Sequence, residues 1–295
     1  MSAVAQATHV ATPSRSAARG WLLPAALLAP AMVWIVAFFL VPLGLMCWRS
    51  LASEGFSLAP YATLLTSPLY TKVLLTTLKL ASIATVCALL LAYPIAFTLT
   101  VAGPRLRGAI LIFVLIPYWV DIIVRSFSWL ILLGDNGLIN KTLIGLGLIG
   151  EPLALLYSTF SVLVAMTQIL LPITIVTLFG AMLRIDLTLL SAAKIHGASD
   201  WQAFRTVFFP LSLPGVYGAG LLAFILGLGF YVTPALLGSP KETMIAQTIM
   251  VEASQLLDWA QASAAGAVLL VITTAIAALY NRYFSLDRLW GGSEP

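Results

Sequence analysis

The sequence predicts an all-α integral membrane protein with six transmembrane helices. The 295-residue chain is 61% hydrophobic and only 9% charged, with a mean hydropathy of +1.02, whereas soluble domains carry about 25% charged residues. Six apolar stretches reach the length of about 20 residues that a helix needs to cross a bilayer. Because unpaired backbone groups are not tolerated in lipid, each stretch is expected to be helical.

The expected spans follow one another along most of the chain. They cover residues 22–48, 73–101, 108–133, 153–183, 207–237 and 262–281. Residues 1–20 form a polar, Ser/Ala-rich arm that we expect to be disordered, and residues 286–295 form a short tail. The first apolar run is too long for a signal-peptide core and no small-residue cleavage site follows it, so we interpret it as a retained span. Residues 21–285 are therefore predicted to form one membrane domain.

Lys and Arg residues are unevenly shared between the two sides of this predicted domain. With the N-terminus inside, the inner segments hold nine of them: Arg15, Arg19, Arg105, Arg107, Arg184, Lys194, Arg205, Arg282 and Arg288. The outer loops hold four: Arg49, Lys72, Lys141 and Lys241. Since Lys and Arg accumulate in cytoplasmic loops, both termini are expected in the cytoplasm.

The same orientation places the polar segment between the fourth and fifth spans on the cytoplasmic side. Asp186 can cap a helix that starts at the next residue, and Gly197 can end that helix in the left-handed conformation. Ser199 and Gln202 have the spacing of a capping box, which starts a second helix. Pro210 is expected to bend the chain back into the membrane. The segment is therefore predicted to be two short helices that project from the bilayer at an angle.

Two interpretations of this segment remain open on its residues alone. It could be an amphipathic loop that lies on the lipid headgroups. Alternatively, the small side chains of Ala192 and Ala193 would let a soluble partner approach closely.

A resemblance to a known family bears on this choice. Ser191-Ala192-Ala193, then Gly197-Ala198, then Pro210-Leu211 resembles the Glu-Ala-Ala (EAA) signature of binding-protein-dependent ABC importer permeases. The chain departs from that signature at Ser191, where the family usually has Glu. The likeness covers about residues 20 to 285 and is greatest to the spermidine/putrescine-type permeases. It is supported by stretches at residues 116–119, 136–140, 170–172, 229–232 and 260–265.

The resemblance implies a MetI-like ABC type I importer permease fold in a bacterial-type inner membrane. The implied function is that of a permease subunit, which forms the path for a small polar solute such as spermidine or putrescine. The implied partners are a second permease subunit in a heterodimer, two cytoplasmic ATPase subunits and a periplasmic binding protein. Within a coupling segment at residues 186–206, the residues implied to dock on the ATPase are Ser191, Ala192, Ala193, Lys194, His196, Gly197, Ala198 and Ser199.

Several classes of function are disfavoured by what the sequence lacks. It has no P-loop, no GxSxG motif and no pair of carboxylates at hydrolytic spacing, so we do not expect an enzyme. No cofactor is expected on this chain, because ATP and Mg would be bound by the partner ATPase. The two cysteines form no metal-ligand pattern, and the scattered basic residues argue against nucleic acid. An ATP-independent secondary transporter or channel remains an alternative.

Asp121 is the main substrate candidate, because it lies beside Tyr118 and Trp119 in a predicted span. Ionisable groups within spans are functional candidates by default. An acid among aromatic rings suits an ammonium ligand through charge pairing and cation–π attraction. An ion pair with Arg125, four residues later on the helix, is the competing interpretation.

Tyr231 is the second substrate candidate. Gly227 and Gly229 are expected to loosen the fifth span, and Pro234 to break it near the outer face. Broken helices are tolerated where they line a transport path, although close packing of small residues would explain the same glycines. The resemblance adds that polyamine-specific relatives tend to carry an acid after this element, where this chain has Thr233. Another amine or an organic ion, such as an aminophosphonate, therefore stays open as the substrate.

Overall fold

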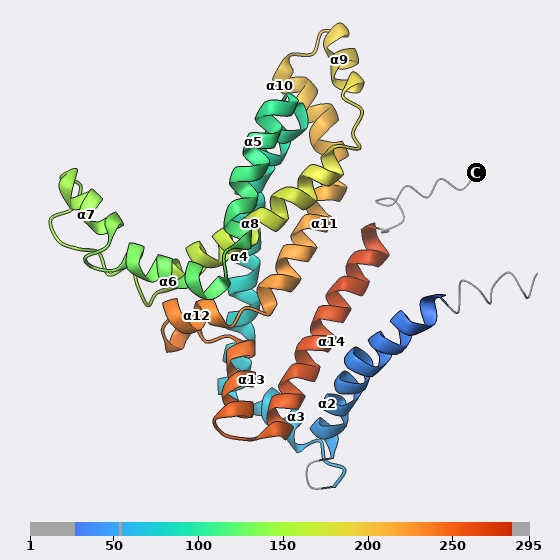
Figure 1. Ribbon diagram of the computed structural model, residues 1–295, viewed down its shortest axis with the longest axis vertical. Helices are drawn as coiled ribbons and strands as arrows, with labels where there is room; N and C mark the ends of the chain where they lie inside the picture. Colours follow the sequence, from blue (N-terminus) through green and yellow to red (C-terminus); the bar gives the residue numbers. More distant parts are fainter. Residues whose placement is uncertain (1–26, 53–54, 285–295) are drawn as a thin grey trace, which may run out of the picture. The chain divides into compact units, whose positions relative to one another are not determined.

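The computed structural model describes residues 27–52 and 55–284, in which all regular structure is helical (Figure 1). The predicted arm at residues 1–20 and the tail at 286–295 lie outside the described residues. Six helices in this part of the chain are long and apolar enough to cross a membrane: Leu27–Leu51, Pro68–Val101, Ile122–Gly145, Thr159–Met182, Asp200–Leu228 and Trp259–Arg282. The all-α class with six membrane-capable helices is confirmed.

The described residues fall into two units, the first ending at Arg49 near the end of the first of these helices and the second beginning at Ser50. The helix contains a wide π-helical turn, η1 (Val36–Leu40), before α2 (Val41–Leu51). In this turn the Val41 N–H bonds to the Val36 carbonyl, five residues back. Pro42 follows immediately, and its ring would clash with the carbonyl four residues earlier in a regular helix. The wide turn makes room for that ring.

Three long helices form the centre of the second unit. They are α4 (Pro68–Val101), α8 (Thr159–Met182) and α11 (Phe209–Leu228), and each packs against the other two. One face of α4 is a fully buried stripe of alanines: Ala81, Ala84, Ala88, Ala92 and Ala96. Small residues let helices approach closely where lipid offers no hydrophobic drive for association.

Two glycines on α11 mark the closest approaches. A Cβ atom built on Gly215 would lie 2.5 Å from the Cβ of Ala181 on α8. A Cβ atom built on Gly227 would lie 3.3 Å from the Cβ of Ala81 on α4. The glycines of α11 therefore set its distance from both neighbours.

The expectation of one continuous helix over residues 108–133 is wrong. The structure has α5 (Pro104–Leu115), a 3₁₀ turn η2 (Ile116–Trp119) and then α6 (Ile122–Leu133). Pro117 cannot donate a backbone hydrogen bond, and Val120 is extended, with φ −80° and ψ 133°. Asp121 then starts α6 as its N-cap, where its side chain accepts from the Ile123 N–H at 2.7 Å.

The fifth predicted span is also broken, but not at the residue expected. Helix α11 ends at Gly229, and α12 (Val232–Leu237) begins after Tyr231. Pro234 lies inside α12 rather than at the break. The physical reason is that a proline is tolerated in the first turn of a helix, where its missing N–H would have no partner.

The second short helix predicted for the polar segment is not a separate helix but is continuous with the fifth span. Helix α10 (Asp200–Ala203) runs through the π-helical turn η3 (Phe204–Phe208) directly into α11. The Phe209 N–H bonds to the Phe204 carbonyl, five residues back. As at η1, a proline follows at once, here Pro210, so the proline widens the helix and does not end it.

The remaining elements of the second unit lie at the ends of the long helices. They are α3 (Ala59–Thr66), α7 (Leu138–Gly145), α9 (Thr188–Ile195), η4 (Pro240–Glu242), α13 (Ile245–Ser254) and α14 (Trp259–Phe284). Figure 1 shows α9 and α10 at the end of this unit that lies farthest from α3 and α13. The unit therefore has one end with the predicted coupling segment and an opposite end built from α3 and α13.

A carboxylate ties the chain together near α12. Glu242 accepts hydrogen bonds from the backbone N–H and the hydroxyl of Ser239 and from the hydroxyl of Thr159 on α8. Burial alone would raise the pKa of Glu242, but these hydrogen bonds outweigh it and lower the pKa below its ordinary value. Glu242 therefore stays ionised and fastens the segment after α12 to the start of α8.

Candidate coupling site and membrane path

The residues predicted to form the coupling segment make one exposed corner between α9 and α10. Ser191, Ala192, Lys194, His196, Gly197 and Ser199 are exposed, and Ala193 and Ala198 are half-buried. His196 is the C-cap of α9. The structure thus brings all eight predicted residues together on a single turn of the chain.

Gly197 makes the corner possible. Its φ is +90°, in the left-handed region that residues with a side chain rarely adopt. The Gly197 N–H bonds to the Lys194 carbonyl, and the Ala198 N–H reaches back to the Ala193 carbonyl at 3.1 Å. These bonds close the end of α9 in the way that helices commonly end at glycine. The prediction that Gly197 ends this helix is confirmed.

Of the two predicted helix starts, the one at Ser199 is formed as expected, whereas α9 starts one residue later than expected. Asp186 accepts from the Thr188 N–H at 2.9 Å, and hydrogen bonds from Thr188 lower the pKa of this carboxyl. Asp186 lies one residue before the N-cap position, which Leu187 occupies. Ser199 and Gln202 form both hydrogen bonds of a capping box.

An ion pair and two exposed apolar side chains at this corner were not predicted from the sequence. Lys194 Nζ lies 2.5 Å from Asp200 Oδ1, which links α9 to α10 across Gly197. Ile195 is 85% exposed and Trp201 is 66% exposed. Residues six apart do not face each other on a regular helix, so the spacing of Lys194 and Asp200 did not predict an ion pair. The left-handed turn at Gly197 brings them together. The corner offers a partner both charge and apolar surface.

Aromatic rings connect the corner to the core. Trp201 stacks on Phe204, and Phe204 stacks on Phe208. From α4, the ring of Phe97 meets Phe204 and Phe208 edge-on, at centroid distances of 5.1 and 4.9 Å. A displacement of the corner would therefore reach α4 through packed rings. The three- and four-residue spacing of Trp201, Phe204 and Phe208 could have indicated one aromatic face, but the contact with Phe97 joins helices far apart along the chain and has no local signal.

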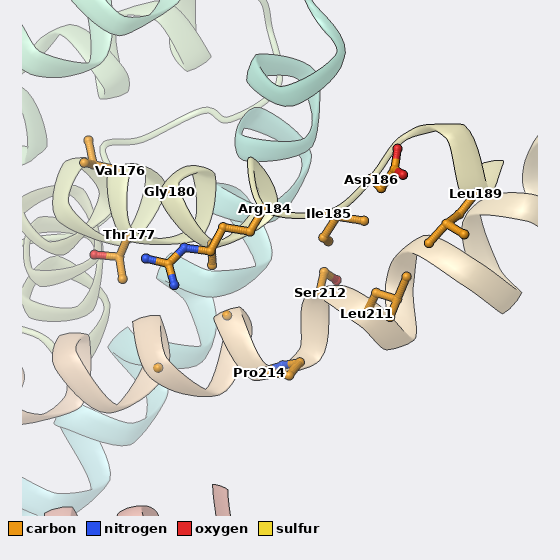
Figure 2. Close-up of a pocket in the computed structure, with 13 residues that line it drawn as sticks. Val176, Thr177, Gly180, Arg184, Ile185, Asp186, Leu189, Leu211, Ser212 and Pro214 are labelled. Carbon is orange, nitrogen blue, oxygen red and sulfur yellow. The ribbon is translucent and has the colours of Figure 1, made fainter. Parts of the chain in front are cut away.

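A cavity of about 660 Å³ lies at the base of the corner, between α8 and α11 (Figure 2). Figure 2 shows the side chain of Arg184 running back along α8 toward Thr177, with Ser212 and Pro214 across from it on α11. Asp186, which starts the corner, lines the same cavity. Movement of the corner would therefore change the shape of this space.

The predicted substrate residues lie at the two breaks in the spans. Tyr118, Trp119 and Asp121 occupy the break between α5 and α6, and all three are exposed, Trp119 at 86%. Tyr231 lies at the break between α11 and α12 and is 38% exposed. The two breaks are linked indirectly, because Ser126 on α6 hydrogen-bonds to Thr233 on α12 at 3.1 Å. No hydrogen bond or ring contact joins Tyr231 to the other three among the residues that the structure describes.

The alternative pairing of Asp121 with Arg125 is not formed. In the described part of the chain the Asp121 carboxylate accepts from a backbone N–H, and no ion pair joins it to Arg125. The Nε and Nη1 groups of Arg125 are buried and have no hydrogen-bond partner among residues 27–52 and 55–284. The carbonyl of Asp121 accepts the Arg125 N–H at 3.1 Å, so both residues share the first turn of α6, but the Asp121 carboxylate caps the Ile123 N–H and does not reach the Arg125 side chain.

Six membrane-capable helices, with one break before the third, another after the fifth and an exposed helical corner between the fourth and fifth, define a helical membrane protein. Comparison with known proteins agrees. Residues 84–286 match the family described as binding-protein-dependent transport system inner membrane component. The chain is 30% identical to the spermidine/putrescine transport system permease protein PotB of Salmonella typhimurium (strain SL1344), over 84% of this chain and 89% of that protein. It is also 30% identical to PotB of Escherichia coli (strain K12), over 84% and 93%.

A solved structure shares the fold. The bacterial alginate ABC transporter, in complex with its alginate pentasaccharide-bound periplasmic protein, matches with a TM-score of 0.73 and 20% identity, over 95% of this chain and 99% of that chain. The chain belongs to the binding-protein-dependent transport system inner membrane components. It is a multi-pass permease subunit of an ABC importer in the inner membrane, and its role is transport rather than catalysis.

Proposed function

We propose that this permease subunit imports a polyamine such as spermidine or putrescine. The similarity to the two PotB proteins supports this substrate class, because it extends over 84% of the chain. The exposed aromatic and acidic side chains at the helix breaks suit a cationic alkylamine. Tyr118, Trp119, Asp121 and Tyr231 would line its path.

The assembly that we propose contains four further subunits. A second, homologous permease completes the path, two cytoplasmic ATPase subunits supply energy, and a periplasmic binding protein delivers the polyamine. ATP and Mg would be bound by the ATPase subunits, and this chain would carry no cofactor. Both termini would lie in the cytoplasm, on the same side as the corner.

The observation that supports the proposed contact with the ATPase is the geometry of the corner. A left-handed Gly197 turns the chain sharply, Lys194 pairs with Asp200 across the turn, and Ile195 projects outward. Closure of the ATPase subunits on ATP would push on this corner. The packed rings of Trp201, Phe204 and Phe97 would pass the displacement to α4 and reopen the path on the other side.

Replacement of Ala193 by Trp tests the proposed ATPase contact. A bulky ring on this half-buried position should displace the docked subunit, so that ATPase copurification and spermidine uptake are both lost. Ala198→Ser, a small change in the same corner, serves as the control and should preserve both. If the Ala193→Trp complex copurifies and transports like the wild type, the corner does not bind the ATPase.

A second candidate substrate is an amine that also carries an anionic group, such as an aminophosphonate. The observation that favours it is Arg125, whose buried Nε and Nη1 groups lack an acceptor in the described chain. An anion could supply that acceptor. Uptake of radiolabelled spermidine, in competition with an unlabelled aminophosphonate, distinguishes the two candidates.

A further inference from the structure

Arg107, in the first turn of α5, fastens that helix to the end of α4. Its Nε–H donates to the Leu99 carbonyl at 2.9 Å, and its Nη2 donates to the carbonyls of Thr100 and Ala102, both at 3.2 Å. The last carbonyls of a helix lack partners within that helix and carry partial negative charge, so a guanidinium suits them. Because the guanidinium is a rigid planar fork, the three bonds fix both the distance and the orientation of α5 on α4.

The same guanidinium also contacts α8. It lies over the ring of Phe179, 5.6 Å from the ring centre, which is within the range of a cation–π contact. Phe179 belongs to the last turn of α8, and its carbonyl accepts the Leu183 N–H where that helix ends. The chain then passes within a few residues to α9 and the coupling corner. Arg107 therefore joins three helices beside the segment that leads to the corner.

One apolar cluster connects these contacts with the corner itself. Leu99 and Phe208 are buried in this cluster, and packed against it are Phe179, Leu190 and Phe204. Leu190 lies on α9 and Phe204 directly follows α10, so both flank the coupling corner. Closely packed interiors compress little and transmit displacement. A push on the corner would therefore reach the surroundings of Arg107.

Helix α5 is otherwise lightly packed. Val114 is its one buried side chain between Pro104 and Leu115, and Phe113 is 80% exposed. Apolar contacts are also non-directional, so they hold a helix less firmly against sliding than hydrogen bonds do. At its other end α5 runs into η2 and the break that carries the proposed substrate residues. The bonds of Arg107 therefore give α5 a directional attachment to the helices around the corner.

We propose that Arg107 is a positioning residue, which makes α5 follow the coupling corner when the ATPase subunits close. The break at the far end of α5 then changes its exposure as the importer passes between its two states. This inference rests on the proposed contact between the corner and the ATPase, and it does not depend on which solute is carried. The competing role is a static cap on α4, which would stabilise the protein without moving α5.

The first test measures exposure at the end of α5 in nanodiscs that hold the complete importer. Ile116 is 60% exposed in η2 and is not one of the proposed substrate residues. In a Cys47→Ala, Cys87→Ala background, Ile116→Cys should react with N-ethylmaleimide at rates that differ several-fold between the nucleotide-free and the vanadate-trapped importer. Arg107→Met keeps an unbranched apolar side chain but removes every donor, so the two rates should converge while vanadate trapping persists.

The second test measures transport in proteoliposomes. Arg107→Met should lower the ratio of spermidine imported to ATP hydrolysed by about tenfold, the usual effect of losing a hydrogen bond to a charged group. Arg107→Lys should recover part of this ratio, because an ammonium keeps the charge but not the planar fork. A static cap would instead lower the Tm of both variants and leave the ratio unchanged.

The matched control is Arg105→Met. Arg105 lies in the same turn of α5 and is exposed, and its side chain makes no hydrogen bond or ion pair with residues 27–52 or 55–284. Its variant should keep the wild-type labelling rates and the wild-type ratio. An equal loss in the Arg105 and Arg107 variants would overturn the inference, because positive charge in this turn would then suffice.

The remaining outcomes separate this inference from the proposed function. A wild-type difference in labelling for Arg107→Met, or equal rates in both states of the wild type, overturns the positioning role. Should Arg107→Met fail to assemble, the same comparison in Arg107→Lys decides, with a wild-type difference again overturning it. A wild-type complex that vanadate cannot trap would instead overturn the proposed ATPase contact. One that is trapped but moves neither spermidine nor putrescine would overturn the proposed substrate alone.

Discussion

At the scale of single residues, Gly197 controls the geometry of the coupling corner. A Cβ atom at this position would meet no other atom within 4 Å, so only the positive φ resists a side chain. Gly197→Ala should therefore cost about 1–2 kcal/mol of local backbone strain and should weaken copurification with the ATPase subunits. Gly197→Asn should be milder, because Asn tolerates the left-handed conformation.

Gly108 provides the control for this prediction. It lies within helix α5, and a Cβ there also has no neighbour within 4 Å. Gly108→Ala should leave copurification and uptake unchanged. Should Gly197→Ala behave in the same way, the left-handed turn would not be required for docking.

Asp121 combines two roles that substitution can separate. Its Oδ1 caps α6, while the proposed path needs its charge. Because Asn caps helices as well as Asp does, Asp121→Asn should keep the thermal stability of the complex. It should lower spermidine uptake by roughly tenfold, since a hydrogen bond to a charged group is stronger than one to a neutral group.

Asp121→Ala removes both the cap and the charge. It should lower uptake and also destabilise the protein by about 0.5–2 kcal/mol, seen as a lower Tm. Wild-type uptake by Asp121→Asn would show that the residue acts only as a cap.

At the scale of helices, α8 and α11 pack closely because Gly215 on α11 has no side chain. A Cβ on Gly215 would lie 2.5 Å from that of Ala181, so Gly215→Ala must push the helices apart. Overpacking of this kind costs about 1–3 kcal/mol. We expect a lower Tm and slower transport, because the cavity below the coupling corner would widen.

Gly180, on α8 at the same cavity, is the matched control. A Cβ there meets nothing within 4 Å, so Gly180→Ala should be neutral or slightly stabilising. Equal Tm values for the two variants would contradict the close approach of α8 and α11 at Gly215.

Prolines had more varied effects on the helices than their positions in the sequence predicted. Pro117 accompanies a break, Pro210 follows a π-helical turn and Pro234 lies in the first turn of a new helix. All three lack the same N–H. Whether each proline broke or widened its helix depended on whether the neighbouring residues could still form their own backbone hydrogen bonds. The local sequence does not predict this.

At the scale of the whole molecule, the excess of positive residues on one side predicts the orientation in the membrane. We expect Ile195→Cys, in the corner, to be labelled by a membrane-impermeant thiol reagent only when the cytoplasmic face is open. Lys141→Cys, in α7, should be labelled only from the periplasmic face. Both measurements need the Cys47→Ala, Cys87→Ala background. Labelling of the two cysteines from the opposite faces would show that the proposed topology is wrong.

The sequence by itself determined the all-α membrane class, six membrane-capable helices and the turn at Gly197. These features depend on composition and on local backbone preferences, which act over a few neighbouring residues. Only the tertiary structure decided where the third and fifth spans break, that Asp121 caps a helix instead of pairing with Arg125, and that Lys194 meets Asp200. It also placed the guanidinium of Arg107 on the carbonyls that end α4. Apart from the local cap at Asp121, these contacts join residues from different helices, and the packing of small side chains, not local preference, fixes how closely those helices approach.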